Sequence, residues 1–209
     1  SRGGVVDPNT GLMKGSFTGL DFFDSIMTTD VPNGRAYFLT TDGSSANAVL
    51  RAYDLNTFIP LGTVSFPIPP SSPSSPVSTL IRWGTNGLAF RNGSFVLFIQ
   101  SALVSNGGII PAPTPTPSPS PSPTPTPYIP TYVKQINLRA NDLTDVSSSG
   151  QIYASVPSSA GANGNSITRI NPQTATLGES VFIGSEPNRL ALSDDGTTLH
   201  VSLDGAAAK

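Results

Sequence analysis

Short turns built around glycine recur along the chain, and each is followed by a segment with the composition of a β-strand. The turns contain Gly34, Gly93, Gly150 and Gly196, and the segments after them read RAYFLTT, SFVLFIQ, QIYASVP and TTLHVSL. Turns of the Asn-Gly and Asp-Gly kind favour β-hairpins because both central positions tolerate positive φ, and such apolar segments are typical of buried strands. Apolar segments also precede the turns, most clearly at 80–90 and 188–193. The chain is therefore expected to form repeated antiparallel hairpins.

A second kind of turn alternates with the first. Asp7, Asp54 and Asn171 each lie between two short strand-like segments, and each has a threonine three positions later. The side-chain oxygen of Asp or Asn accepts a hydrogen bond from the backbone two residues on, which closes a turn. Each of these three residues therefore predicts a further hairpin.

Together the two kinds of turn predict a repeated unit of strand, glycine turn, strand, loop, strand, Asx turn and strand. Such a unit is a four-stranded antiparallel sheet, with a period near the roughly 40 to 50 residues of a β-propeller blade once proline-rich insertions are discounted. A single sheet cannot bury both of its faces, so blades stacked around an axis are the expected fold. A β-sandwich is the alternative, because the period alone does not separate the two folds.

A proline-rich tract interrupts this pattern. From Pro111 to Pro127 every second residue is proline. Proline fixes φ and lacks a backbone donor, which excludes helix and sheet and leaves polyproline II. Hydroxyl residues alternate with the prolines and are candidate O-glycosylation sites, namely Thr114, Thr116, Ser118, Ser120, Ser122, Thr124 and Thr126. The alternative is an unmodified, semi-rigid spacer.

The tract divides the chain into three parts. Residues 1–106 are expected to hold a half-blade and about two blades, residues 107–130 to form a linker or an inserted loop, and residues 131–209 to form further blades. The chain opens at the third strand of one blade and stops after the second strand of another. The expected fold class is all-β, with β-propeller-type four-stranded antiparallel blades, incomplete at both termini, and a polyproline II-like insertion.

Composition excludes several classes of structure and function. Charged residues make up only 11% of the chain, against about 25% in an ordinary soluble domain, and helical surfaces depend on such residues. The net charge of −2 provides no basic surface for a nucleic acid. The absence of cysteine excludes disulfides and thiolate metal sites. No apolar run approaches the roughly 20 residues that span a bilayer.

Residues that carry catalysis or bind metals are sparse. His200 is the only histidine, so it has neither a second histidine nor a cysteine with which to hold a metal. Asp194 and Asp195 precede a turn glycine and lack the alternating acids of a calcium loop. We expect no catalytic residue, no metal ligand and no cofactor. Asn92 begins an Asn-Gly-Ser sequence that fits the N-glycan acceptor pattern, although a hairpin turn explains the same residues.

Three segments together resemble a known family. GSEPNRLALSDDGTTLHVSLDG (184–205), GQIYASVPSSAGANGNSITRINPQTATLG (150–178) and LIRWGTNGLAFRNGSF (80–95) are similar to the blades of bacterial secreted and cell-surface β-propeller proteins of the YVTN and NHL-like kind. The resemblance implies a propeller fold, and a surface module that has no catalytic residues in common with its relatives. A complete member of that family would carry more blades than this chain does. The tract is therefore either a joint between two propellers or a loop inserted within one.

The half-blades expected at the two ends are complementary. Strands within 3–7 and 12–18 would complete the sheet begun by 188–203, either within one chain or between copies. Between copies, the contact is strand addition at an open edge, and because it is heterologous it propagates as a filament.

These observations lead to one expected function and one alternative. We expect a non-catalytic structural or adhesive protein that is extracellular or on the cell surface. Its partners would be other copies of itself, as a homopolymer, or adjoining blades of a longer chain, with covalent glycans, no nucleic acid and no membrane span. The alternative is a fragment of a larger ligand-binding or enzymatic β-propeller whose active residues lie outside this chain.

Overall fold

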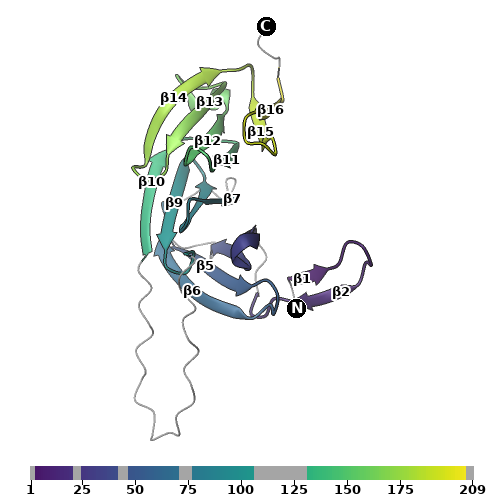
Figure 1. The fold of residues 1–209 in the computed structure, drawn as a ribbon. Helices are drawn as coiled ribbons and strands as arrows, with labels where there is room; N and C mark the ends of the chain where they lie inside the picture. Colours follow the sequence, from purple (N-terminus) through teal and green to yellow (C-terminus); the bar gives the residue numbers. More distant parts are fainter. Residues whose placement is uncertain (1–2, 21–24, 42–46, 71–76, 106–130, 206–209) are drawn as a thin grey trace, which may run out of the picture.

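The computed structural model describes residues 3–20, 25–41, 47–70, 77–105 and 131–205. Its strands form three four-stranded antiparallel sheets and two two-stranded sheets (Figure 1). The expected all-β fold of four-stranded antiparallel blades, with a two-stranded sheet at either end, is confirmed. Within the described parts of the chain no helix is long and apolar enough to cross a membrane.

Each four-stranded sheet is a meander in chain order. Sheet I consists of β3 (Ser25–Asp30), β4 (Arg35–Thr41), β5 (Asn47–Asp54) and β6 (Pro60–Pro67). Sheet II consists of β7 (Ser78–Trp83), β8 (Gly87–Asn92), β9 (Phe95–Ser101) and β10 (Thr131–Asn137). Sheet III consists of β11 (Asp142–Val146), β12 (Gln151–Val156), β13 (Ser166–Asn171) and β14 (Thr176–Phe182). Short 3₁₀ turns lie at η1 (Val31–Asn33) and η2 (Ser158–Ala160).

The two-stranded sheets flank this stack. The first hairpin is β1 (Gly4–Val6) with β2 (Met13–Ser16), and the last hairpin is β15 (Pro187–Leu192) with β16 (Leu199–Leu203). First strands lie side by side along the stack, β3 beside β7, β7 beside β11 and β11 beside β15. The sheets therefore share one inner side, as blades do. In Figure 1 they form an open arc with one hairpin at each end.

The apolar cores lie between neighbouring sheets, because alternate side chains of each strand point to opposite faces. In β4, Tyr37 and Leu39 face sheet II, whereas Ala36 and Phe38 face the first hairpin. Sheet II likewise contributes Phe90 to the core with sheet I, and the remaining core lies between sheets II and III. The principal residues of that core are Trp83, Ala89, Val96, Phe98, Leu143, Ile152, Ala154 and Ile170.

Sheet II departs from the turn pattern expected from sequence. The segment 80–90 was expected to be one strand before Gly93, but it contains the end of β7, a turn and most of β8. Gly84, at φ 54°, therefore occupies the place that Gly34 and Gly150 hold in the other sheets. A Cβ at Gly87 would lie 2.2 Å from the indole of Trp83, so glycine is needed where β8 begins. Gly93, at φ 60°, instead closes the turn between β8 and β9.

The proline-rich tract lies between two strands that pair with each other. β9 and β10 are joined along their whole length, from Ser101 opposite Thr131 to Phe95 opposite Asn137. The tract therefore connects neighbouring strands of a single sheet. Its polyproline II conformation and its seven candidate O-glycosylation residues lie outside the described residues, so both stay predictions.

Candidate assembly interface

The Asx turns have one common geometry. The Oδ1 atom of Asp54 accepts hydrogen bonds from the backbone of Asn56 and Thr57, at 2.9 and 2.8 Å. Oδ1 of Asn171 accepts from the second and third residues after it, and Oδ1 of Asp7 accepts from the second. The fourth residue after each Asx has positive φ, and these residues are Gly11 (70°), Phe58 (61°) and Ala175 (55°).

The shared turn shows which part of a sheet the first hairpin represents. In sheets I and III this turn joins the third strand to the fourth, so β1 and β2 are equivalent to a third and a fourth strand. The pairing register shifts next to the turn in all three cases. The equivalent cross-strand pairs after the shift are Val6 with Met13, Tyr53 with Pro60, and Ile170 with Leu177.

Replacing Asp54 by alanine is expected to lower the free energy of unfolding by about 1 kcal/mol, because the backbone N–H groups of the turn lose their acceptor. Hydrogen bonds from Thr57 hold the pKa of Asp54 below its ordinary value. A carboxyl whose folded-state pKa is depressed stabilises the fold above its unfolded-state pKa, near 3.9, and loses that contribution as the pH falls. Urea unfolding at pH 7 and pH 3 measures both effects.

Asp54→Asn is the matched control, because asparagine already closes the same turn at Asn171. This variant keeps the acceptor and removes the titrating group. Its deficit relative to the unsubstituted chain should shrink as the pH falls from 7 to 3. A deficit that stays constant over this range would contradict the assignment.

The last hairpin is equivalent to the first and second strands of a sheet. In sheet I, Asp30 and Arg35 close the first turn, and four residues lie between them. In the last hairpin, Ser193 and Thr198 close the turn with the same spacing. The Asp195 carboxylate accepts hydrogen bonds from Ser193 Oγ and the Thr197 backbone, which lower its pKa. Among the described residues, this sheet contains only its first and second strands.

Hydrogen bonds attach the last hairpin to sheet III. The Leu190 N–H donates to Asp142 Oδ2 at 3.0 Å, and Ser155 Oγ donates to the Asn188 carbonyl at 2.6 Å. The opposite edge of β16 pairs with no other described strand, and the same is true of the outer edge of β1. The two hairpins do not pair with each other. Both edges therefore present unpaired backbone groups, as edge strands do.

One face of the first hairpin packs on sheet I. Phe17, which follows β2, makes edge-to-face contacts with Phe38, Tyr53 and Phe58, at ring-centroid distances of 5.0 to 5.4 Å. Val5 lies against this same cluster. This aromatic cluster therefore attaches the first hairpin to sheet I.

The other face of the first hairpin is uncovered. Val6 is 53% exposed and Met13 is 66% exposed. The equivalent residues in complete sheets, Tyr53 and Ile170, are 1% and 0% exposed because a neighbouring layer covers them. The first hairpin therefore carries side chains of core type at positions that no described layer covers.

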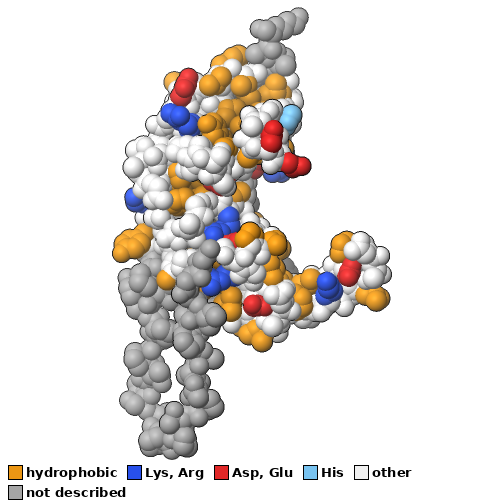
Figure 2. Space-filling view, viewed as in Figure 1, with side chains coloured by type: hydrophobic (Ala, Val, Ile, Leu, Met, Phe, Trp, Pro, Cys, Tyr) orange, Lys and Arg blue, Asp and Glu red, His pale blue; other side chains and the backbone are white. Residues whose placement is uncertain are grey.

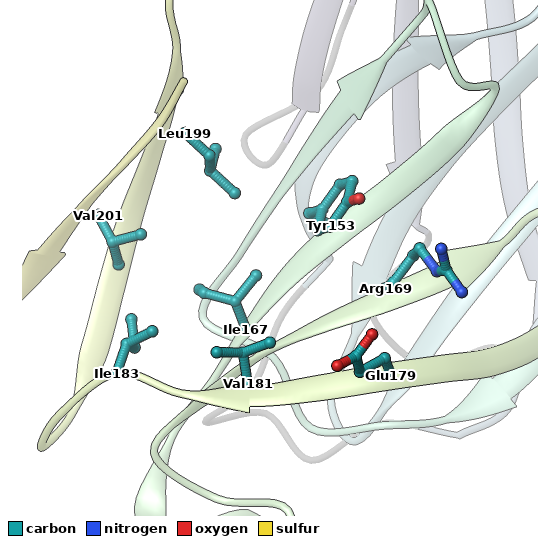
Figure 3. A pocket seen from close by; sticks show the side chains of 8 residues that line it. All are labelled: Tyr153, Ile167, Arg169, Glu179, Val181, Ile183, Leu199 and Val201. Atoms are coloured by element: carbon teal, nitrogen blue, oxygen red, sulfur yellow. The ribbon is translucent and has the colours of Figure 1, made fainter. Parts of the chain in front are cut away.

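A groove lies at the other end of the stack, between sheet III and the last hairpin (Figure 3). Its volume is about 280 Å³. The cross-strand pair Ile167 and Val181 lines it and is equivalent to Leu50 and Val64, which sheet II covers. Val181 is 53% exposed. The complete lining is Tyr153, Ile167, Arg169, Glu179, Val181, Ile183, Leu199 and Val201.

The space-filling view shows the same pattern on the surface. Apolar side chains gather in the upper part of the molecule, over sheet III and beside the last hairpin, and others are exposed on the first hairpin (Figure 2). The sequence pattern predicts both half-sheets, but it identifies neither the groove residues nor the uncovered pair on the first hairpin, Val6 and Met13. The sequence signal for the uncovered face is the apolar residue directly before each Asx, because Val6 holds the position of the buried residues Tyr53 and Ile170.

A polar cluster lies at the inner ends of the sheets. Arg82 Nε contacts Asp30 Oδ2 at 2.7 Å, which joins sheet II to sheet I. Asp145 of sheet III lies at the same pocket, and burial raises the pKa of its carboxyl. His200 is exposed on β16, far along the chain from this cluster. Among the described residues, no group of three or more His, Cys, Asp or Glu side chains could hold a metal ion.

Asn92, the candidate N-glycan acceptor, is fully buried. Its Nδ2 atom, where a glycan would be attached, donates a hydrogen bond to the Pro69 carbonyl at 2.7 Å. The residue also pairs with Phe95 across the Gly93 turn. This geometry favours its interpretation as a turn residue.

A scan against protein-family models and a search of curated proteins find no match to this chain.

Proposed function

We propose that this protein is a non-catalytic structural subunit of an extracellular filament, and that its copies join by completing one another's sheets. The first hairpin of one copy supplies the third and fourth strands of the sheet that the last hairpin of another copy begins. The observation that carries the proposal is the burial contrast. Val6 and Val181 are each 53% exposed, although the equivalent positions in the complete part of the stack are covered.

The geometry of such a contact leads to a polymer. The donor hairpin and the acceptor edge are different surfaces at opposite ends of the chain, so the contact is heterologous. The assembly always keeps one free hairpin at one end and one free edge at the other, so growth continues unless the rotation closes a ring. Main-chain hydrogen bonds along the new strand pair would supply affinity, and the covered side chains would supply specificity.

The cellular context is also a proposal. The resemblance to bacterial secreted and surface propellers, with YVTN and NHL-like blades, supports a place outside the cell and an adhesive or structural role. The Pro/Ser/Thr-rich tract inserted between β9 and β10 supports O-glycosylation, because its composition keeps hydroxyl groups out of regular structure. Intact mass of native material measures the added sugar and reveals whether further blades extend the polypeptide.

Deleting residues 1–18 is expected to leave a monomer under conditions in which the full chain forms large assemblies. The deletion removes the donor hairpin together with Phe17, and it leaves sheets I to III and the acceptor edge in place. Sedimentation velocity and electron microscopy measure the outcome.

Deletion of residues 107–130 is the matched control, because it also shortens the chain but removes no described strand from either end of the stack. This variant should assemble as the full chain does. A full chain that stays monomeric would overturn the proposal, as would a variant without residues 1–18 that still assembles. Native material with a much longer polypeptide would favour the ligand-binding or enzymatic propeller instead.

A further inference from the structure

We infer the residue register of the joint between copies: Leu199 lies opposite Val6 of a second copy, His200 opposite Val5, and Val201 opposite Gly4. This inference rests on the proposed function and deepens it, because it specifies which copy-to-copy strand pair forms and how the two strands align. β16 and β1 are both edge strands, so their alignment is not fixed within one chain.

The complete sheets fix equivalent positions on the acceptor strand. Leu199 directly follows Thr198, the residue that closes the first turn of the last hairpin. Ile152 holds this position in sheet III and Ala36 holds it in sheet I, each directly after a turn-closing residue. Leu199 is therefore the counterpart of Ile152 and Ala36.

The donor strand is placed in the same way. Val6 directly precedes the Asx residue of the first hairpin, as Ile170 does in sheet III and Tyr53 does in sheet I. In sheet III, Ile152 lies opposite Ile170, and in sheet I, Ala36 lies opposite Tyr53. The two sheets give the same answer independently, and it places Leu199 opposite Val6.

The burial pattern agrees with the same alignment. Ile152 and Ile170 share the core between sheets II and III, and Ala36 and Tyr53 share the core beneath the first hairpin. Each pair thus faces the preceding layer of the stack. Leu199 already lines the groove on sheet III, so Val6 opposite it would be covered by that groove.

A slip of one residue would break this arrangement. The side chains of a strand alternate between faces, so a one-residue shift places Val5 opposite Leu199. Val5 already packs with Phe17 on the opposite face, so Leu199 and its new partner would point to different sides. Only a shift by an even number of residues keeps the faces matched. A shift of two in one direction leaves only Gly4 opposite β16, and in the other direction it moves Val6 to Val201, away from the pairing that both complete sheets show.

Cysteine cross-linking tests the register, because the chain has no cysteine of its own. Two variants each carry one in-register pair: Val6→Cys with Leu199→Cys, and Val5→Cys with His200→Cys. Two pairs are needed because hydrogen-bonded and non-hydrogen-bonded positions differ in their Cα separation. Mild oxidation should convert at least one of them into a disulfide-linked ladder on a non-reducing gel.

The control variant carries Val6→Cys with Val201→Cys, which is offset by two residues on the same face. Diagonal neighbours lie about 7 to 8 Å apart, which is too far for an unstrained disulfide. The control should give at least roughly tenfold less disulfide-linked product than the in-register variant that cross-links best. Sedimentation under reducing conditions first shows that each variant assembles.

The outcomes separate the two proposals. A ladder from an in-register pair and little from the offset pair supports the register. Assembly with a ladder from the offset pair alone, or with no ladder from either in-register pair, overturns the register and leaves the filament intact. A full chain that does not assemble under reducing conditions overturns the filament itself.

Discussion

A single aspartate at either end of the stack is expected to stop assembly. Val6→Asp places a carboxylate on the uncovered face of the first hairpin, and Val181→Asp places one in the groove on sheet III. Each side chain is 53% exposed in the single chain, so either charge stays solvated in the monomer and the fold tolerates it. In the joint the carboxylate would lose its contact with water among apolar side chains, at a cost of several kcal/mol. Since about 1.4 kcal/mol is a factor of ten, association should weaken at least about 100-fold.

Mixing the two variants gives the sharper result. The Val6→Asp chain keeps an intact groove and edge, and the Val181→Asp chain keeps an intact hairpin. A 1:1 mixture should therefore form one good joint and stop at a dimer. Sedimentation velocity distinguishes the dimer from the two monomers and from a polymer.

Tyr132→Asp is the matched control, because Tyr132 is 69% exposed on β10 in the middle of the stack. It introduces the same charge away from both ends and should leave assembly unchanged. If mixing restored long polymers, or if either aspartate variant assembled normally, the joint would lie elsewhere.

The repeated unit could be predicted from the sequence because each turn is determined by residues within the turn itself. Asp54 and Asn171 close turns with their own side chains, and the positive φ of Gly34 and Gly150 needs no distant partner. Local signals of this kind survive whatever the tertiary context. The two half-sheets at the ends were found for the same reason.

The start of sheet II differs from the prediction because two turns lie close together in its sequence. Gly84 and Gly93 both have positive φ, and both are followed by apolar residues. Which of them begins the sheet depends on Trp83, whose indole packs over Gly87 and against Phe98 of a later strand. That contact is tertiary, so the local pattern did not contain it.

The candidate joint was only partly predictable. The sequence indicated that strands at the two ends complement each other, since each lacks what the other has. It did not show which faces are left open, because exposure of Val6 and Val181 follows from where the neighbouring layer ends. The periodicity shows that a position is apolar, but it does not show whether a neighbouring layer covers that position.

Replacing Arg82 by methionine is expected to destabilise the fold by about 3 to 5 kcal/mol, a large part of the roughly 5 to 15 kcal/mol that a domain of this kind has. Arg82 Nε donates to Asp30 Oδ2 at 2.7 Å, and its other nitrogens donate to the carbonyls of Gly87 and Thr85 at 3.1 Å. Asp30 is only 6% exposed. Without the guanidinium, the Asp30 carboxylate stays buried between sheets I and II. Of the hydrogen bonds described for it, only the two that Asn33 donates remain.

The double variant Asp30→Asn with Arg82→Met separates the orphaned charge from the lost packing. It removes both ions, keeps an acceptor oxygen and an amide at position 30, and retains an apolar stem at position 82. It should recover a substantial part of the lost stability, because breaking a buried pair costs more than replacing both members. Urea unfolding in a Val6→Asp background measures the free energy without interference from assembly. A double variant no more stable than Arg82→Met alone would mean that the lost hydrogen bonds to the β7–β8 turn within sheet II, and not the orphaned Asp30 carboxylate, account for the destabilisation.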